Sequence, residues 1–180
     1  MIAIIWQTVS YNAMTMKIKL TIILLAFLAP NFSFGQIKLA DLKVDTTITG
    51  FHFAADFQGT NVFTNDGASD MHTINPTAFS FTIAPNMKAA EAKDQFELLL
   101  SMSEQSGYKI IDIFKKDTTL KGNNAYYISY IETDDKVNYK NFVFNAFVIK
   151  DKTIILFTSG DLDNGRLSDK LRKTFYSINL

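Results

Sequence analysis

The sequence predicts an α+β domain, an antiparallel β-sheet flanked by helices, with a signal peptide in front of it. Apolar and polar residues alternate over residues 78–83, as in a strand with one buried face. Apolar residues at helical spacing mark two amphipathic helices, one over 88–106 and one over 167–178. Three strand-like segments with short connections lie between them, and short connections make neighbouring strands antiparallel. These features together favour the α+β class.

The signal peptide is predicted over residues 17–36. Two lysines precede an uninterrupted apolar run over residues 20–29, and small residues follow this run. Ser33 and Gly35 occupy the −3 and −1 positions, so we expect cleavage between Gly35 and Gln36. An uncleaved membrane anchor is the alternative, but the apolar run is short for a span, which needs about 20 residues.

The start of translation is open between Met1, Met14 and Met16, because residues 1–13 carry no charge and the two later methionines stand directly before the leader. No arginine pair precedes the apolar run, so the general export route fits better than the twin-arginine route. The chain has no cysteine, which excludes a lipid-anchored lipoprotein. Residues 1–35 are therefore predicted to be an extension plus a cleavable leader.

Residues 36–180 are predicted to form a single domain whose stability comes from one hydrophobic core. The leader holds two lysines and no acid, so 16 of the 18 Lys and Arg remain against 18 Asp and Glu, a net charge of −2. Such a balance gives no long-range field for nucleic acid. Only Arg166 and Arg172 are arginines, which makes bidentate phosphate recognition a poor fit as well. Without disulfides, the core must come from the many phenylalanines.

The N-terminal part of this domain is predicted as two segments. Residues 46–57 are β-branched and aromatic around Gly50, which indicates a strand or hairpin. Residues 58–75 are rich in Gly, Asn, Asp, Ser and Thr, which indicates a long surface loop. The strand over 78–83 follows, and Pro85 ends it.

The first helix is predicted to end at Gly107, which is placed as a C-cap glycine. Residues 108–114 then carry apolar side chains on both faces, which indicates a central strand. A three-stranded meander and a polar turn lead into the second helix. Their predicted ranges are 125–132, 141–149 and 153–158 for the strands, 150–152 for the last hairpin turn and 159–165 for the turn before the helix.

Residues 78–180 resemble the PsbP-like fold family, which includes the photosystem extrinsic protein and a Ran-binding protein. Three local matches carry the resemblance: a strand over 78–85 ending in proline, a glycine turn into an aromatic strand over 120–127, and the closing helix at 175–178. The resemblance implies a sheet with helices on both faces, a PsbP-like sandwich. It also implies a non-catalytic binding module, and it transfers no functional residue.

The two histidines have no spacing that marks a metal site or a catalytic dyad. His52 lies between two phenylalanines in a predicted strand, and His72 lies near Asp70 in the polar loop. Structural or solvated roles are the simpler interpretation. The alternative is a hydrolase-type enzyme whose site joins His72 to Asp70 or Asp56 from distant parts of the sequence.

Carboxylates gather at residues 161–165 in a pattern like the start of a calcium loop, but the glycine comes one position early and Arg172 replaces the required glutamate. A helix N-cap by Asp163 or Asn164 explains the same residues better. In the long loop, Asn65, Asp66 and Asp70 are either a weak cation site or simply polar.

Two further short patterns are interpreted as structural. Ser106 and Lys109 match a Ser-x-x-Lys spacing, but this serine closes a helix where the catalytic one opens a helix. Asp134 and Asp135 are interpreted as part of a solvated turn with Lys136, and not as a catalytic pair.

Aromatic residues crowd the segment 126–147. They either form a tyrosine-lined binding groove or fill a sheet covered by helices on both faces, and the second interpretation fits the two-sided pattern better.

The sequence therefore predicts an exported small domain, periplasmic or secreted, that acts as a binding or accessory protein of the cell envelope. No cofactor and no metal is expected. The partner is an unknown protein or small molecule, with no nucleic acid and no stable membrane span after cleavage. A hydrolase remains the alternative, and a structural envelope-associated protein is a third possibility.

Overall fold

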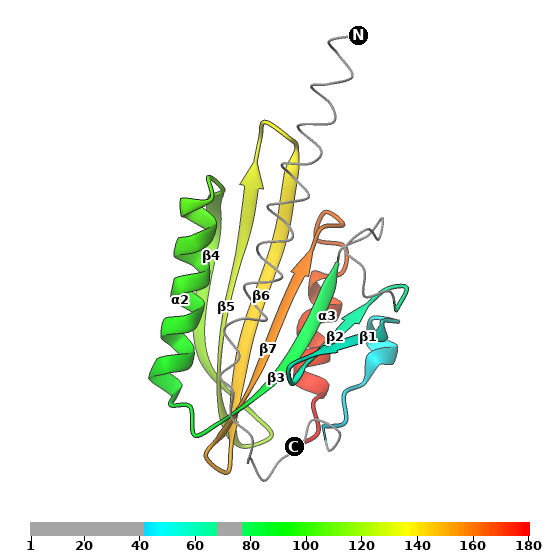
Figure 1. Cartoon of the computed structure of the whole chain (residues 1–180), viewed down its shortest axis with the longest axis vertical. Coiled ribbons are helices and arrows are strands. Elements are labelled where there is room, and N and C mark those ends of the chain that lie inside the picture. Colours follow the sequence, from blue (N-terminus) through cyan, green and yellow to red (C-terminus); the bar gives the residue numbers. More distant parts are fainter. Residues whose placement is uncertain (1–41, 68–76) are drawn as a thin grey trace.

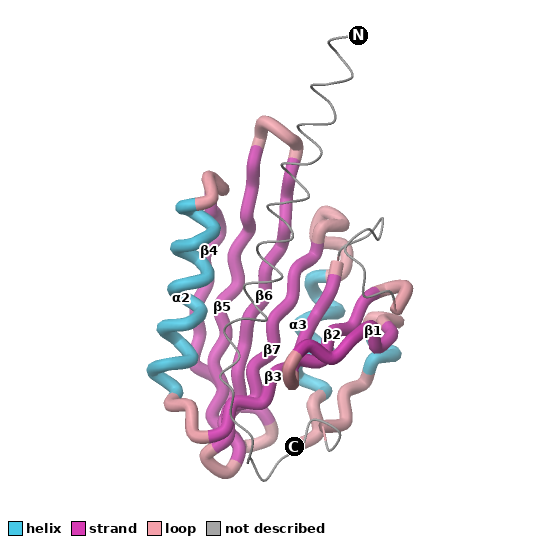
Figure 2. Tube along the Cα trace, in the orientation of Figure 1, coloured by secondary structure: helices cyan, strands magenta, loops and turns pink. Residues whose placement is uncertain are grey.

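In the computed structural model, which describes residues 42–67 and 77–180, one antiparallel sheet of seven strands carries a helix on each face (Figures 1 and 2). The strand order across the sheet is β1-β2-β3-β7-β6-β5-β4. The elements are η2 (Thr46–Ile48), β1 (His52–Phe57), β2 (Thr60–Thr64), β3 (Ala78–Pro85), α2 (Ala89–Gln105), β4 (Lys109–Leu120), β5 (Asn123–Asp134), β6 (Tyr139–Lys150), β7 (Thr153–Asp161) and α3 (Ser168–Ser177). The predicted α+β class is confirmed.

The predicted meander is confirmed as β5, β6 and β7, each strand longer than its expected range. Asp151 and Lys152 close the last hairpin with φ angles of 48° and 64°, as in a two-residue turn of type I′. β3 pairs with β7, so residues distant in the sequence form the middle of the sheet.

The two helices cover opposite faces and form two separate cores, as their apolar stripes predict (Figure 1). On one face, Phe96 of α2 is buried against Phe147 and Ile128. On the other face, Phe175 and Leu171 of α3 pack into a cluster of phenylalanine side chains from β3, β6 and β7. The sheet is therefore the common wall of an α2-side core and an α3-side core.

Helix α2 ends in a Schellman motif at the predicted glycine. Gly107 has a φ of 89°, and its N–H donates to the carbonyl of Glu104 at 2.9 Å. The N–H of Tyr108 donates to the carbonyl of Ser103 at 3.2 Å. This reversal places Tyr108 directly beside the last turn of α2.

The prediction of a central strand over 108–114 is wrong, because β4 is the edge of the sheet. A bulge between Ile111 and Phe114 adds a residue to β4, and Asp112 in this bulge has a φ of 55°. The extra residue breaks the alternation of faces. Ile113 and Phe114 are 47% and 52% exposed, so apolar residues on both sides of β4 do not indicate two covered faces.

The predicted loop over 58–75 is wrong for residues 60–64, which form β2 in a hairpin with β1. The polar threonines of this segment are compatible with a strand because the sheet satisfies their hydroxyls. Thr60 and Thr82 share a hydrogen bond of 2.8 Å between their Oγ1 atoms. The predicted strand or hairpin over 46–57 begins with the short helix η2, where the Asp45 carboxylate accepts the N–H of Thr47 at 3.0 Å.

The predicted cap by Asp163 or Asn164 is also wrong. Helix α3 is anchored by Asp161, whose buried carboxylate accepts the N–H of Leu167 at 2.7 Å and the hydroxyl of Ser168 at 3.1 Å. Asp161 reaches these groups because it ends β7 directly beneath the start of the helix. The calcium-loop pattern is thus explained by hydrogen bonds to the chain itself.

Candidate functional site

The α3-side face of the sheet is exposed at Phe114, next to the bulge in β4. Helix α3 packs against β6, β7 and η2 and lies behind that part of the sheet in Figure 2, whereas β4 and β5 lie beyond it. The strand register directs Phe114 to the same face as Ser129, and Ile131 to the same face as Phe142. Phe114 is 52% exposed on this face. We name the area defined by exposed Phe114 and partly buried Ser129, Ile131 and Phe142 the open face.

A groove of about 180 Å³ lies where the open face meets α3. Its floor is apolar and its walls carry opposite charges, with Asp112 from the β4 bulge and Arg172 from α3. Two hydroxyl groups, those of Ser129 and Ser168, add neutral hydrogen-bonding groups. The groove is lined by Asp112, Ser129, Tyr130, Ile131, Phe142, Val143, Phe144, Ser168, Leu171 and Arg172.

The guanidinium of Arg172 lies over two aromatic rings. Its central carbon is 5.8 Å from the ring centroid of Tyr127 and 5.6 Å from that of Phe144. Cation–π contacts of this kind favour arginine, whose flat and weakly hydrated group stacks on rings. Arg172 makes no ion pair within residues 42–67 and 77–180. Its charged group is therefore exposed and lies against rings, with no ion-pair partner among the described residues.

Two further cations project from the same face. Lys116 pairs across the sheet with Tyr127, which directs both to this face, and Lys140 holds its Nζ 4.9 Å from the ring centroid of Phe142. Neither lysine forms an ion pair in the described part of the chain. Arg172, Lys116 and Lys140 thus place three cations on this face, and Asp112 is the acidic residue of the groove's lining.

A row of aromatic rings leads from the open face into the core. The centroids of Phe114 and Tyr127 are 5.8 Å apart, those of Tyr127 and Phe144 are 5.4 Å apart, and those of Phe144 and Phe175 are 5.9 Å apart. Tyr126, Tyr127 and Tyr130 of the crowded segment are buried. The covered-sheet interpretation holds for these tyrosines, and the open face is lined by phenylalanine.

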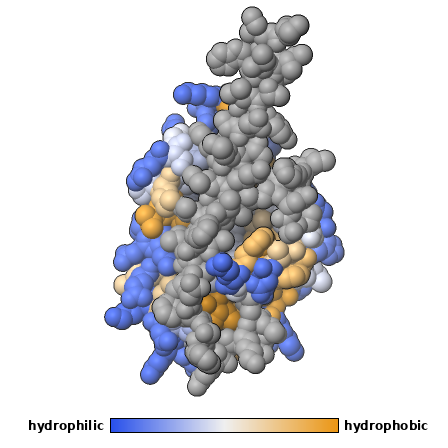
Figure 3. Space-filling view, viewed as in Figure 1, coloured by the Kyte–Doolittle hydropathy of each residue, from blue (hydrophilic) through white to orange (hydrophobic). Residues whose placement is uncertain are grey.

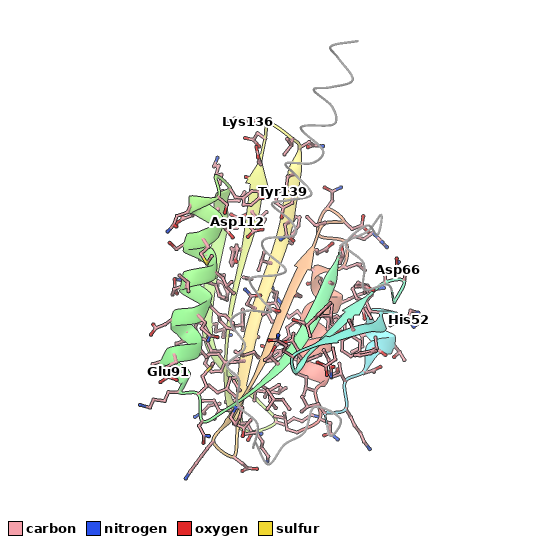
Figure 4. The ribbon with its side chains drawn as sticks, in the orientation of Figure 1. His52, Asp66, Glu91, Asp112, Lys136 and Tyr139 are labelled. Carbon is pink, nitrogen blue, oxygen red and sulfur yellow. The ribbon has the colours of Figure 1, made fainter. Side chains whose placement is uncertain are left out.

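The opposite face has a polar cluster around Glu132, which is buried at 2% exposure. Its carboxylate accepts hydrogen bonds from Ser103 Oγ at 2.5 Å, Asn141 Nδ2 at 2.9 Å and the Tyr139 hydroxyl at 3.2 Å. Gly160 makes room for Asn141, because a Cβ at Gly160 would lie 2.9 Å from Asn141 Oδ1. Figure 4 shows Tyr139 toward the end of the sheet that carries Lys136. The cluster lies beneath the last turn of α2.

The tyrosines of this cluster hold their protons firmly. Burial, with the charges of Glu132 and Asp134, raises the pKa of Tyr108 to about 12. Burial and Glu132 also raise the pKa of Tyr130 and that of Tyr139 well above the usual range. The rings of Tyr108 and Tyr139 stack with centroids 4.9 Å apart. Because the carboxylate is hydrogen-bonded and enclosed, we interpret the cluster as structural.

Of the histidine and aspartate residues considered for catalysis, the structure describes only Asp56. The register of β1 places His52 and Asp56 on opposite faces, and the Asp56 carboxylate accepts the N–H of Gly59 at 2.8 Å in the hairpin turn. Asp70 and His72 lie outside the described residues. A hydrolase site that joins His72 to Asp70 or Asp56 stays a prediction.

The remaining candidate residues have local roles. Asp66 accepts the hydroxyl of Thr64 at 3.1 Å, Asp134 accepts the N–H of Lys136 at 3.1 Å, and Ser106 is the C-cap of α2. Across residues 42–67 and 77–180, no group of three or more His, Asp or Glu is placed to hold a metal ion. In the same ranges, no helix is long and apolar enough to cross a membrane.

Sequence reasoning missed the groove, since its residues come from β4, β5, β6 and α3. Arg172 is one of only two arginines, and this rarity was the one available signal. Asp112 gave no signal, because the bulge that turns it into the groove depends on pairing with β5.

Comparison with known proteins finds likeness in fold alone. No family model and no curated protein sequence matches the chain. The solution structure of the cyanobacterial PsbP protein CyanoP, from Synechocystis sp. PCC 6803, is 15% identical, covers 84% of this chain and 99% of its own, and has a TM-score of 0.49. A mutant of the protein Mog1 is 11% identical over 82% of this chain and 96% of its own, with a TM-score of 0.47.

A Pseudomonas aeruginosa protein of unknown function, PA94, is 13% identical over 71% of this chain and 86% of its own, with a TM-score of 0.45. The predicted resemblance to the PsbP-like family is therefore confirmed as a likeness of fold. Identities of 11% to 15% carry no residue role to this chain.

Proposed function

We propose that the mature chain is an exported, non-catalytic binding protein of the cell envelope that recognises its partner through the groove beside α3. The observation that carries this proposal is the Arg172 guanidinium, held over two rings and free of any ion pair in the described residues. A preorganised cation beside an apolar floor is typical of a recognition site. The exposed ring of Phe114 extends the same surface.

A non-catalytic role is supported by the chemistry of the two polar sites. Catalysis needs a base or nucleophile with positioned neighbours and access to a substrate. Glu132 and its partners are buried beneath α2. Among the described residues, the groove offers the hydroxyl groups of Ser129 and Ser168, the acidic residue Asp112 and the guanidinium of Arg172, and His52 does not line it. These groups suit hydrogen bonding to a ligand.

A ligand screen by two-dimensional NMR on the purified protein tests the role of the groove. We expect ligands found in a mixed peptide and small-molecule library to shift the amide signals of Ser129, Phe142 and Arg172. Phe114→Ser should weaken the binding of these ligands. Leu98→Ser is the matched control, because Leu98 is 46% exposed on α2, which lies on the other face. Ligands that shift amide signals outside the groove, and that bind Phe114→Ser as tightly as the parent protein, would contradict the proposal.

Export is proposed on the leader alone, and intact-mass measurement tests it. We expect the protein recovered outside the cytoplasm to begin at Gln36, because Gly35 is the small residue before the predicted cut. Substituting a bulky charged residue, Gly35→Arg, should block cleavage and leave a heavier chain with the membranes. Abundant cytosolic protein with an intact leader would contradict the proposal.

A further inference from the structure

We propose that the groove binds the C-terminal residue of a peptide, with its carboxylate on Arg172 and its apolar side chain on the floor. This inference rests on the proposed binding function. The size of the groove is the first argument. At about 180 Å³ it is smaller than the roughly 300–1,000 Å³ of pockets for drug-sized ligands. A groove of this size holds about one amino-acid residue of a ligand.

The charge of the groove is the second argument. Arg172 makes no ion pair among the described residues, and its planar fork of donors matches a carboxylate. Lys116 and Lys140 add positive charge nearby without carboxylate partners in the same ranges. An anionic group is therefore the complement of this surface.

The floor of the groove provides the third argument. Ile131 and the rings of Phe142 and Phe144 form an apolar surface, which an acidic side chain does not fill. A residue that carries both an apolar side chain and a carboxylate is one at the end of a chain. An internal aspartate or glutamate offers the carboxylate but lacks a separate apolar side chain.

Asp112 fits the same occupant. The carboxylate of Asp112 would repel an acidic ligand unless the ligand also donates a hydrogen bond to it. The backbone N–H of the terminal residue supplies such a donor, and Asp112 is exposed in the β4 bulge on the wall contributed by β4. A free aromatic acid has no such N–H group.

Three probes separate these features in NMR titrations of the purified protein up to about 10 mM, since ligands of this size bind at roughly millimolar Kd. N-acetylphenylalanine mimics a peptide end, its carboxamide lacks the charge, and 3-phenylpropionate lacks the N–H. We expect N-acetylphenylalanine to shift Ser129 and Phe142 and to bind about tenfold more tightly than either other probe. The carboxamide loses the charged hydrogen bonds to Arg172, which are about twice as strong as neutral ones, and 3-phenylpropionate loses the N–H that donates to Asp112.

Arg172→Gln should remove most of the preference for the acid over the carboxamide, and Lys173→Gln should leave it unchanged. Lys173 is the matched control because it is an exposed cation on α3 outside the groove. Circular dichroism and melting of both variants should match the parent protein, which separates lost recognition from lost folding.

Equal binding of acid and carboxamide at the groove would overturn the carboxylate assignment and leave the groove as a binding site. Equal binding of 3-phenylpropionate would overturn the peptide end in favour of a free acid. No shift of Ser129 or Phe142 with any probe would overturn the inference. The library screen described above decides the proposed function separately, because it does not depend on a charged ligand.

Discussion

Glu132 is a buried carboxylate whose partners are hydrogen-bond donors and not a cation. An isolated buried carboxylate is costly, and only well-placed donors offset the loss of water. Here Ser103, Tyr139 and Asn141 supply donors from α2 and β6. The residue therefore joins the end of the helix to two strands of the sheet.

Glu132→Ala should destabilise the protein by about 3 kcal/mol, because it leaves several buried donors without an acceptor at about 1–3 kcal/mol each. Glu132→Gln should cost less, since its carbonyl oxygen still accepts. Urea unfolding followed by circular dichroism measures both changes. Glu104→Ala, at an exposed position of α2, is the control and should stay within about 0.5 kcal/mol. An equal effect of the control would contradict the role of Glu132.

Tyrosine ionisation should weaken the fold at high pH. Below pH 10 the phenol of Tyr108 is neutral in both states, and its pKa of about 12 in the folded protein lies above the ordinary value of 10.0. Between these values the unfolded chain releases a proton that the folded protein keeps, so stability falls as pH rises through this window.

Urea unfolding from pH 9 to pH 12, with tyrosinate absorbance recorded in parallel, measures this loss. Tyr108→Phe should lose less stability over the same window than the parent protein. Lysine titration is common to both proteins and cancels in the comparison. Identical slopes for the two proteins would contradict a raised pKa at Tyr108.

At the scale of elements, helix α3 begins where a residue from the preceding strand accepts its free N–H groups. The sequence favoured Asp163, which lies nearer to the helix, yet its carboxylate pairs with Arg166 at 2.6 Å from Nε on the surface. Asp161 is fully buried and accepts donors from Asp163, Leu167 and Ser168. Because Asp161 is buried, we expect its hydrogen bonds to stabilise the start of α3 more than the surface ion pair of Asp163 does.

Asp161→Ala should therefore destabilise the protein by about 2 kcal/mol, the upper range for a lost helix cap. Asp163→Ala should cost less than about 1 kcal/mol, because it removes an exposed ion pair. Urea unfolding of the two single variants compares them directly. A larger loss for Asp163→Ala would restore the cap predicted from the sequence.

The edge strand β4 is protected against pairing with other chains. Its lysines, Lys109, Lys115 and Lys116, place charge along the edge, and the bulge at Asp112 bends it. The same bulge lets Asp112 line the groove. One irregularity in the strand thus serves both protection and the proposed recognition site.

At the scale of the whole molecule, the two cores share one sheet and should unfold together. Phe96→Ala in the α2-side core and Phe175→Ala in the α3-side core should each cost about 3–5 kcal/mol. Transitions followed by far-ultraviolet circular dichroism and by tyrosine fluorescence should coincide for the parent and both variants. Two separate transitions would show that the sheet does not couple the cores.

The open face follows from the unequal extent of the two layers of the molecule. On the α3 side, β4 and β5 are buried at Leu120 and Tyr127 but exposed at Phe114, while on the other side α2 packs against β4. Figure 3 shows that other side, with an apolar area beside β1 and β2. Phe57 is the last residue of β1, is 43% exposed and does not line the groove, so the recognition proposal is placed on the open face.

The sequence by itself determined the elements whose signals are local. The alternation at Phe79 and Phe81, the helical stripe at Phe96 and the helix-ending Gly107 each follow from side-chain spacing or backbone freedom within one segment, and all were predicted correctly. The leader ending at Gly35 is also a local pattern, and it stays a prediction.

Only the tertiary structure decided the features that need two distant segments. Whether β4 is central or at the edge depends on what pairs beside it, and whether Asp161 or Asp163 holds α3 depends on which one the sheet buries. The groove requires Asp112 of β4 and Arg172 of α3, which are distant in the sequence, to line the same surface. Spacing along a chain specifies periodicity and turns, whereas burial and pairing arise only when the segments pack together.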